Sequence, residues 1–150
     1  MRKPDLFGLF LYIITIMKIL LFVLLIPLCT NAIANENWTL IHEDKATKTT
    51  FYVKLDNFKL FENKVRMWVM ESFAAPQKVK KLEYSSLKSL IQVDCGAKKL
   101  RYMAYSLYKN KKAQGVSIYN KGVPSEWLSV NSNTINSAYM NIACEEAKAS

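Results

Sequence analysis

Few residues in this chain have the type and spacing that covalent or metal chemistry needs. The chain has one histidine, His42, so a Ser-His-Asp or Cys-His arrangement would have to use it. His42 stands beside Glu43 in a short predicted strand or turn, where a surface imidazole is the simpler interpretation. The pair Glu145–Glu146 closes a predicted terminal helix and is expected to be solvated, and no glycine-rich phosphate loop occurs. We therefore predict no catalytic, cofactor-binding or metal site, and we expect that the protein is not an enzyme.

Cys95 and Cys144 are the only cysteines in residues 35–150. An even number of cysteines in an exported domain indicates a disulfide, and two cysteines allow one pairing. The bridge would close a loop of about 50 residues, which is worth roughly 4 kcal/mol in the chain-entropy model. A redox or metal-binding role for these cysteines lacks support, because the chain has no CxxC pair.

Export of this domain is predicted from residues 17–34. Lys18 supplies a positive charge, Ile19 to Leu28 form an apolar segment, and Ala32-Ile33-Ala34 has the small residues of a cleavage site. We therefore interpret residues 1–34 as an N-terminal extension and signal peptide, with the signal at 17–34, and residues 35–150 as the mature domain. The mature protein is then expected to be extracytoplasmic: secreted, periplasmic or on the outer surface.

An alternative interpretation of the N-terminus stays open. Phe7 to Leu28 is long enough to be an uncleaved anchor, which needs ~20 apolar residues, with Lys18 as its single charge. The protein would then start at Met1 rather than Met17 and would contact the membrane through this segment. Lipidation of Cys29 is disfavoured, because Pro27-Leu28 stand where a lipoprotein signal has small residues.

The mature domain is strongly basic. It holds 18 of the chain's 21 basic residues and 11 of its 12 acidic ones, a net charge of about +7. Such a charge favours acidic partners such as heparin-like glycans, anionic lipid head groups or nucleic acid. The predicted compartment argues against nucleic acid. A simpler interpretation also remains, since lysine is the usual solvated residue on strand faces and edges.

Alternating apolar residues from Trp38 to Tyr119 predict antiparallel strands that each bury one face. Val65, Met67 and Val69 lie on the inward face, so Arg66, Trp68 and Met70 are expected to face outward. Phe73–Lys81 contains a proline and a lysine cluster and is predicted to be a loop.

The period changes after Trp127. Polar residues that can cap a helix are followed by an apolar stripe at helical spacing: Ile135, Ala138, Tyr139, Ile142 and Ala143. We therefore predict an α+β fold, an antiparallel sheet of about six strands with a C-terminal helix tethered by the Cys95–Cys144 disulfide.

The candidate binding surface combines Arg66 and Trp68 with Lys109, Lys111 and Lys112. The three lysines follow a basic and aromatic strand, Leu100 to Tyr108. Aromatic faces beside cations can hold acidic ligands, although solvated turns flanking a packed strand would show the same residues.

The chain resembles the surface-adhesin protein E-like family of Gram-negative bacteria. The residues that carry the resemblance run in order along residues 38–144: Trp38, Lys64-Val-Arg-Met-Trp68-Val, Pro76-Gln-Lys, Tyr84-Ser-Ser86, Val93-Asp94-Cys95, Leu100 to Tyr108, Gly115, Pro124-Ser-Glu-Trp127 and a terminal helix ending at Cys144.

This resemblance implies a small exported domain with a six-stranded antiparallel sheet and a C-terminal helix held by the disulfide. It also implies a homodimer and a non-enzymatic adhesin that binds host extracellular-matrix or serum proteins. The family's name-giving member is a lipoprotein, whereas Cys29 here lacks the matching signal. The other function that we consider is a periplasmic structural or envelope protein without a host ligand.

Overall fold

The computed structural model describes residues 12, 14, 16–18, 37–122 and 124–149. The chain divides into two compact units, Met1–Asn35 and Glu36–Ser150. Most of the predicted signal peptide lies outside the described residues, so its role stays a prediction. Within the described ranges, no helix is long and apolar enough to cross a membrane.

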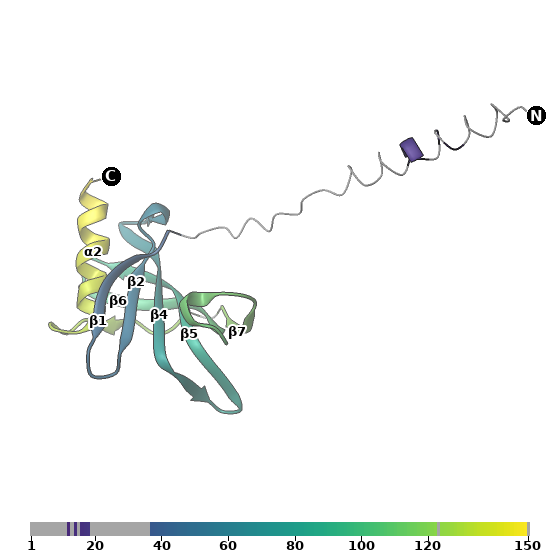
Figure 1. Ribbon diagram of the computed structural model, residues 1–150. Helices are drawn as coiled ribbons and strands as arrows, with labels where there is room; N and C mark the ends of the chain where they lie inside the picture. Colours follow the sequence, from purple (N-terminus) through teal and green to yellow (C-terminus); the bar gives the residue numbers. More distant parts are fainter. Residues whose placement is uncertain (1–11, 13, 15, 19–36, 123, 150) are drawn as a thin grey trace, which may run out of the picture. The chain divides into compact units, whose positions relative to one another are not determined.

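The second unit is an antiparallel sheet with one long helix (Figure 1). The strand order is β1-β2-β4-β5-β6-β7, with β3 beside β4 and β8 beside β6. In sequence order the elements are β1 (Thr39–Asp44), β2 (Thr49–Val53), the 3-10 turn η1 (Leu55–Asn57), β3 (Lys59–Phe61), β4 (Lys64–Val79), β5 (Leu82–Asp94), β6 (Lys99–Tyr108), the 3-10 turn η2 (Lys111–Ala113), β7 (Ser117–Lys121), β8 (Leu128–Ser129) and α2 (Ile135–Ala149).

The predicted fold class is confirmed, and the difference in strand number has a simple cause. β2 and β3 pair with successive parts of β4, and β7 and β8 pair with successive parts of β6. Eight strands therefore occupy six positions across the sheet. The two short strands, β3 and β8, were not predicted, because runs of three and two residues are too short to show an alternation.

One sheet face packs against α2 and forms the hydrophobic core. The inward residues of β4 that the alternation predicted, Val65, Met67 and Val69, are at most 1% exposed. They cluster with Ile91 and Val93 of β5 and with helix residues Tyr139, Met140 and Ala143. The predicted helical stripe is therefore confirmed, and it covers this face, which we call the core face.

The predicted disulfide is present. Cys95 and Cys144 are bonded, with their Cα atoms 5.8 Å apart and 49 residues between them in sequence. Cys95 directly follows β5 and Cys144 lies in α2, and both pack against the core cluster. The bridge therefore ties the helix to the sheet that it covers.

The predicted loop at Phe73–Lys81 is wrong. β4 continues to Val79 and pairs with β5 beyond an irregularity between Ser72 and Gln77, and the resulting hairpin projects past its neighbours (Figure 1). Residues 73–76 face the single residue Ser85 across this bulge. Pro76 is tolerated there because it need not donate a ladder hydrogen bond.

Met70 lies on the predicted sheet face, but it is only 1% exposed and does not reach solvent. Its side chain lies on the face opposite α2, as the alternation requires, but η2 packs over this part of β4 and β5. A second, smaller buried layer therefore exists on that face, with Ser72 and Ser86 also buried.

Candidate binding surface

The sheet face opposite α2 carries cations placed over aromatic rings. We call it the cation–aromatic face and define it by Arg66, Trp68, Lys88, Arg101 and Lys112 with the rings that they contact. Arg66 and Trp68 alternate along β4 with the core residues, and both are partly buried. Register pairing places Lys88 of β5 opposite Met70, on this same face.

Five cation–aromatic contacts lie on this face. The Lys88 ammonium is 5.2 Å from the Trp68 ring centroid and 5.5 Å from that of Trp38. The guanidinium carbons of Arg66 and Arg101 lie 4.7 Å from Phe61 and 4.5 Å from Trp127. Lys112 lies 6.0 Å from the Tyr52 ring, at the outer limit for such a contact.

Arg66, Gln92 and Arg101 form one row across β4, β5 and β6, because Gln92 pairs with both arginines. The side chain of Gln92 is buried, and its Oε1 accepts hydrogen bonds from Arg101 Nε at 2.9 Å and Nη2 at 2.7 Å. Arg66 Nε, in contrast, is buried and has no hydrogen-bond partner in the described part of the chain. The row therefore contains one arginine that hydrogen-bonds to Gln92 and one whose buried Nε has no partner among the described residues.

The segment around η2 is fastened to the cation–aromatic face by two buried serines. The Ser86 hydroxyl donates to Asn110 O at 2.5 Å and accepts from Ala113 N at 2.8 Å. Lys112 N donates to Ser72 Oγ at 3.2 Å. The backbone of this segment is thereby held in place, and two of its residues, Lys112 and Ala113, have positive φ values of 54° and 51°.

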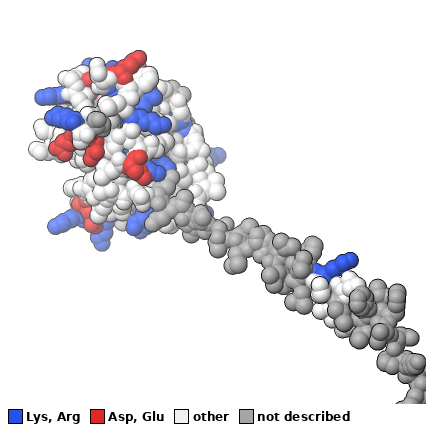
Figure 2. Space-filling view, turned by 90° about the horizontal axis from the view of Figure 1, so that it is seen from above, with Lys and Arg blue, Asp and Glu red and all other residues white. Residues whose placement is uncertain are grey.

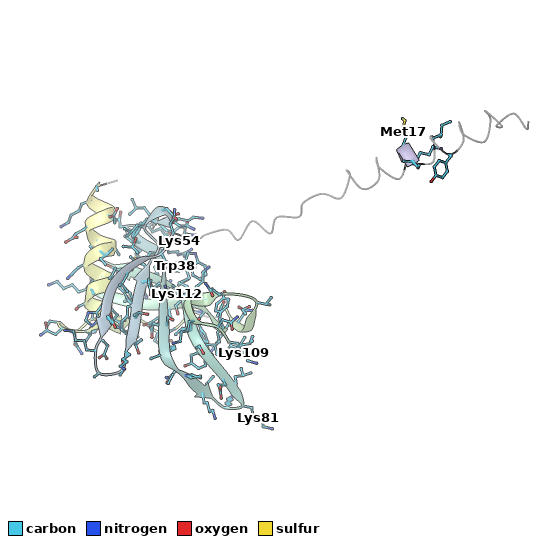
Figure 3. All side chains as sticks on the ribbon, in the orientation of Figure 1. Met17, Trp38, Lys54, Lys81, Lys109 and Lys112 are labelled. Carbon is cyan, nitrogen blue, oxygen red and sulfur yellow. A yellow bond between two sulfur atoms is a disulfide. The ribbon has the colours of Figure 1, made fainter. Side chains whose placement is uncertain are left out.

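The structure brings the predicted surface residues onto one face. Lys109, Lys111 and Lys112 are exposed, and the segment that carries them crosses the face on which Arg66 and Trp68 lie. Figure 3 labels Lys109 and Lys112 beside the sheet and Lys81 at the far tip of the β4–β5 hairpin. The second predicted lysine cluster, residues 78–81, is therefore separate from this surface.

Sequence reasoning missed Lys88 as a residue of this face and Gln92 as the buried side chain between its two arginines. A signal was available, because the inward positions Ile91 and Val93 place Lys88, Leu90 and Gln92 outward by alternation. The contact between Arg101 and Trp127 had no such signal, since it depends on the short pairing of β8 with β6.

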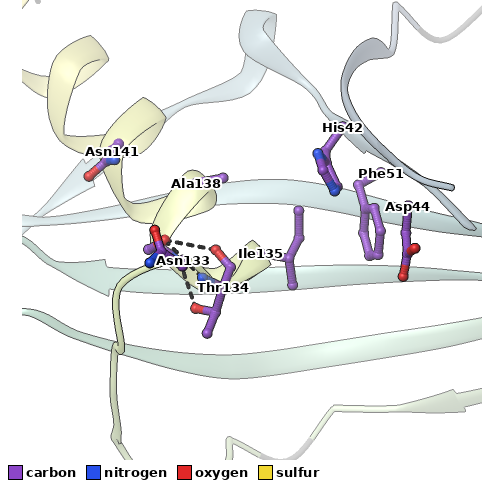
Figure 4. Close-up of a pocket in the computed structure, with 9 residues that line it drawn as sticks. His42, Asp44, Phe51, Asn133, Thr134, Ile135, Ala138 and Asn141 are labelled. Carbon is purple, nitrogen blue, oxygen red and sulfur yellow. Dashed lines mark hydrogen bonds between the residues drawn. The ribbon is translucent and has the colours of Figure 1, made fainter. Parts of the chain in front are cut away.

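A groove of about 530 Å³ lies between β1, β2 and the start of α2 (Figure 4). Three of its polar side chains, Asp44, Thr134 and Ser137, are engaged in local turns. The Asp44 carboxylate accepts from Ala46 N and Thr47 N, and these hydrogen bonds lower the pKa of Asp44. Thr134 and Ser137 exchange capping hydrogen bonds at the helix start. Exposed His42 also lines the groove, but nothing here combines into a catalytic arrangement.

Three ionisable residues lie on the core face: Tyr139 is buried, and Glu71 and Tyr102 are partly buried. Burial raises the pKa of Glu71, and burial together with the Glu71 charge raises the pKa of Tyr102 to about 12 and that of Tyr139 further. The Tyr102 hydroxyl is 3.2 Å from Asn136 Oδ1, whereas the Tyr139 hydroxyl has no hydrogen-bond partner among the described residues. Tyr139 belongs to α2 and Tyr102 contacts Asn136 of α2, so this group is part of the packing between helix and sheet.

Basic and acidic side chains alternate over the view in Figure 2, with no continuous basic patch on that side of the domain. Within the described residues, no group of three or more His, Cys, Asp or Glu side chains is arranged to hold a metal ion. The candidate surface is therefore defined by the local geometry of its cations and rings rather than by net charge.

The fold is similar to solved structures of Haemophilus influenzae protein E. Crystal form II aligns with a TM-score of 0.54 and 15% identity over 63% of this chain and 80% of that one. The selenomethionine form aligns with a TM-score of 0.55 and 14% identity over 71% and 85%. No curated protein matches the sequence.

The profile of the family described as surface-adhesin protein E matches residues 38–145. The chain belongs to the surface-adhesin protein E family. The match begins at Trp38 of the cation–aromatic face and ends just after Cys144, so it spans the sheet, the helix and the disulfide. Family and fold together support an adhesin-like surface protein.

Proposed function

We propose that residues 35–150 are an exported, non-enzymatic binding module that uses its cation–aromatic face and the Lys109–Lys112 segment to bind host extracellular-matrix or serum proteins or acidic glycans. Membership of a surface-adhesin family supports this proposal. The observation that carries it is that Arg66, Trp68 and the three lysines lie on one sheet face, although they are up to 46 residues apart in sequence.

The chemistry of the face fits an acidic partner. Cations held over aromatic rings keep their positive charge at the surface while their side chains lose little further freedom on binding. The η2 segment is held by the buried hydroxyls of Ser72 and Ser86, so its lysines project from a fixed backbone. Because this backbone is already ordered, binding a ligand costs it little further conformational entropy.

A binding assay with a matched charge control tests the proposal. Lys109, Lys111 and Lys112 are replaced together by Ser, and the variant is compared with one that replaces the exposed Lys45, Lys81 and Lys148. Both variants lose the same charge, so we expect weaker binding to immobilised matrix proteins and heparin only in the first. Binding should also weaken as salt rises, because the Debye length falls from ~10 Å at 0.1 M to ~3 Å at 1 M.

Equal loss in both variants would show that only net charge matters. No binding by the wild-type protein, together with its recovery only in osmotic-shock fluid, would favour a periplasmic structural or envelope protein. Surface exposure is measured by protease treatment of intact cells.

We also propose a homodimer. The edge strand β7 exposes apolar side chains, with Ile118 39% and Val116, just before it, 87% exposed, and an uncovered edge can pair with a second copy. Sedimentation equilibrium is expected to show a dimer that Val116→Lys and Ile118→Lys weaken. A monomer at all concentrations would contradict this.

A further inference from the structure

We infer that the Arg66–Gln92–Arg101 row binds the sulfate groups of a sulfated polysaccharide. This assignment rests on the proposed binding function and names the chemistry of its ligand. It starts from an incomplete feature of the face: the Arg66 guanidinium makes no hydrogen bond or ion pair with the described residues, and its Nε is buried.

A buried donor without a partner costs free energy, and the cost is larger for a charged group. Such a group in a folded protein therefore calls for an explanation, and a bound anion is one. Among the described residues, Nε is the buried atom of this guanidinium without a partner, and no carboxylate there forms an ion pair with the charge that Nε shares with the two Nη groups. An oxyanion that docks on the two Nη groups would supply the missing negative charge.

The two arginines are oriented for oxyanions. The guanidinium carbons of Arg66 and Arg101 lie 4.7 and 4.5 Å from the Phe61 and Trp127 ring centroids, so an aromatic ring restricts each planar group. Arg101 uses two of its five N–H donors on Gln92 Oε1 and keeps three. A fixed planar fork suits tetrahedral oxyanions such as sulfate, which accept paired hydrogen bonds.

The surroundings of the row favour an extended ligand with several anionic groups. Arg66 and Arg101 are two strands apart, roughly 10 Å. Lys59 of β3 pairs with Arg66 and so lengthens the row. Lys64 and Lys99 lie on the same face one row further along, where both pair with Asp94. The Asp94 carboxylate forms an ion pair with Lys64 Nζ at 3.9 Å and accepts a hydrogen bond from Ala97 N.

A slender chain fits this site better than a bilayer. Both arginines are partly buried and lie within the sheet face, whereas a flat membrane surface would first meet the protruding lysines of the turns. A polysaccharide with sulfate groups at intervals can reach the row and the flanking lysines together.

The test measures binding of a heparin oligosaccharide by titration calorimetry at physiological salt. Arg66→Lys and Arg101→Lys keep the charge but lose the planar fork, and we expect each to weaken binding about tenfold. Lys81→Arg replaces an ammonium by a guanidinium at the tip of the β4–β5 hairpin, away from the row. This control variant is expected to leave binding unchanged. A desulfated oligosaccharide should not bind, and circular dichroism checks that each variant is folded.

Gln92→Glu provides a second variant. It keeps an acceptor for Arg101 but places a negative charge between the two guanidinium groups, so binding should fall by more than in either lysine variant. Unchanged binding in Arg66→Lys and Arg101→Lys overturns the inference, as does the absence of heparin binding by the wild-type protein.

The source of the anion is tested with vesicles of phosphatidylcholine and phosphatidylglycerol. If vesicle binding depends on Arg66 and heparin binding does not, the polysaccharide assignment is wrong. If matrix proteins bind and Arg66→Lys has no effect on any ligand, only this inference fails. If the wild-type protein binds none of the ligands, the proposed function fails with it.

Discussion

Single residues explain why parts of the surface followed from the sequence and parts did not. Alternation about Val65, Met67 and Val69 placed Arg66 and Trp68 correctly, because a strand's side chains must point to opposite faces. The same rule put Met70 on the correct face but could not show that η2 would cover it. Burial depends on what packs above a residue, and that information is distant in sequence.

Ionisation of Glu71 is expected to destabilise the folded state. Its side chain lies on the core face, and burial raises its pKa. Because this pKa is higher in the folded state, the contribution of Glu71 to the free energy of unfolding is complete below the unfolded-state pKa. That contribution is lost as pH rises through the folded-state pKa. The wild-type protein should therefore lose stability as pH rises from about 4.3, the ordinary glutamate pKa, towards neutral.

Glu71→Gln removes the ionisation and keeps the shape of the side chain. We expect the variant to be more stable than wild type at neutral pH, and the difference to shrink as pH falls. Urea unfolding at a series of pH values measures this. Parallel pH profiles for the two proteins would contradict the prediction, and Glu83→Gln, in an exposed pair with Lys78, serves as the control.

At the scale of elements, the sequence was most reliable where the apolar pattern was long. The terminal helix and the strands beside it followed from residues 64–71, 87–95 and 135–143. The error at Phe73–Lys81 arose because proline was taken as the end of a strand, whereas a bulge lets the strand pass through Pro76. A bulge is a property of two paired strands, so one strand's sequence does not show it.

The bridge between β5 and α2 is expected to be a main source of stability. Replacing both Cys95 and Cys144 by Ser should lower the free energy of unfolding by about 2 to 5 kcal/mol, as in other small exported domains. Urea unfolding under non-reducing conditions measures the loss, and the reduced wild-type protein provides the comparison. A loss below ~1 kcal/mol would mean that the core alone holds α2 in place.

The η2 segment tests whether the fixed backbone matters for binding. Ser86→Ala removes two hydrogen bonds, to Asn110 O and from Ala113 N, and should cost on the order of 1 to 2 kcal/mol. Amide hydrogen exchange at Lys112 and Ala113 should become faster, and affinity for the ligand should fall although no charge is lost.

Ser85→Ala is the matched control, because the neighbouring Ser85 lies opposite the β4 bulge, away from η2. Equal exchange rates in the two variants would show that Ser86 does not hold the segment. Lower affinity without faster exchange would show that loosening of the segment is not the cause of the weaker binding.

For the molecule as a whole, the disulfide and the predicted signal peptide indicate the same oxidising compartment. A bridge between Cys95 and Cys144 forms and persists in an oxidising environment, and a signal peptide at residues 17–34 would deliver the domain to one. The basic domain, the surface-adhesin family and the predicted export signal are therefore consistent with one another. The export signal lies in residues 17–34, and the charge and the family match come from the domain that follows.

This consistency gives a prediction about processing. When the full chain is expressed in a Gram-negative host, we expect cleavage after Ala34, because small residues at 32 and 34 follow an apolar segment that starts at Ile19. Intact-mass measurement of the purified protein should give residues 35–150 without a free thiol. Ala34→Arg should block cleavage, while Ala46→Arg, in the β1–β2 turn, should leave it unchanged. Retention of residues 1–16, or a lipid on Cys29, would show that the N-terminus is an anchor instead.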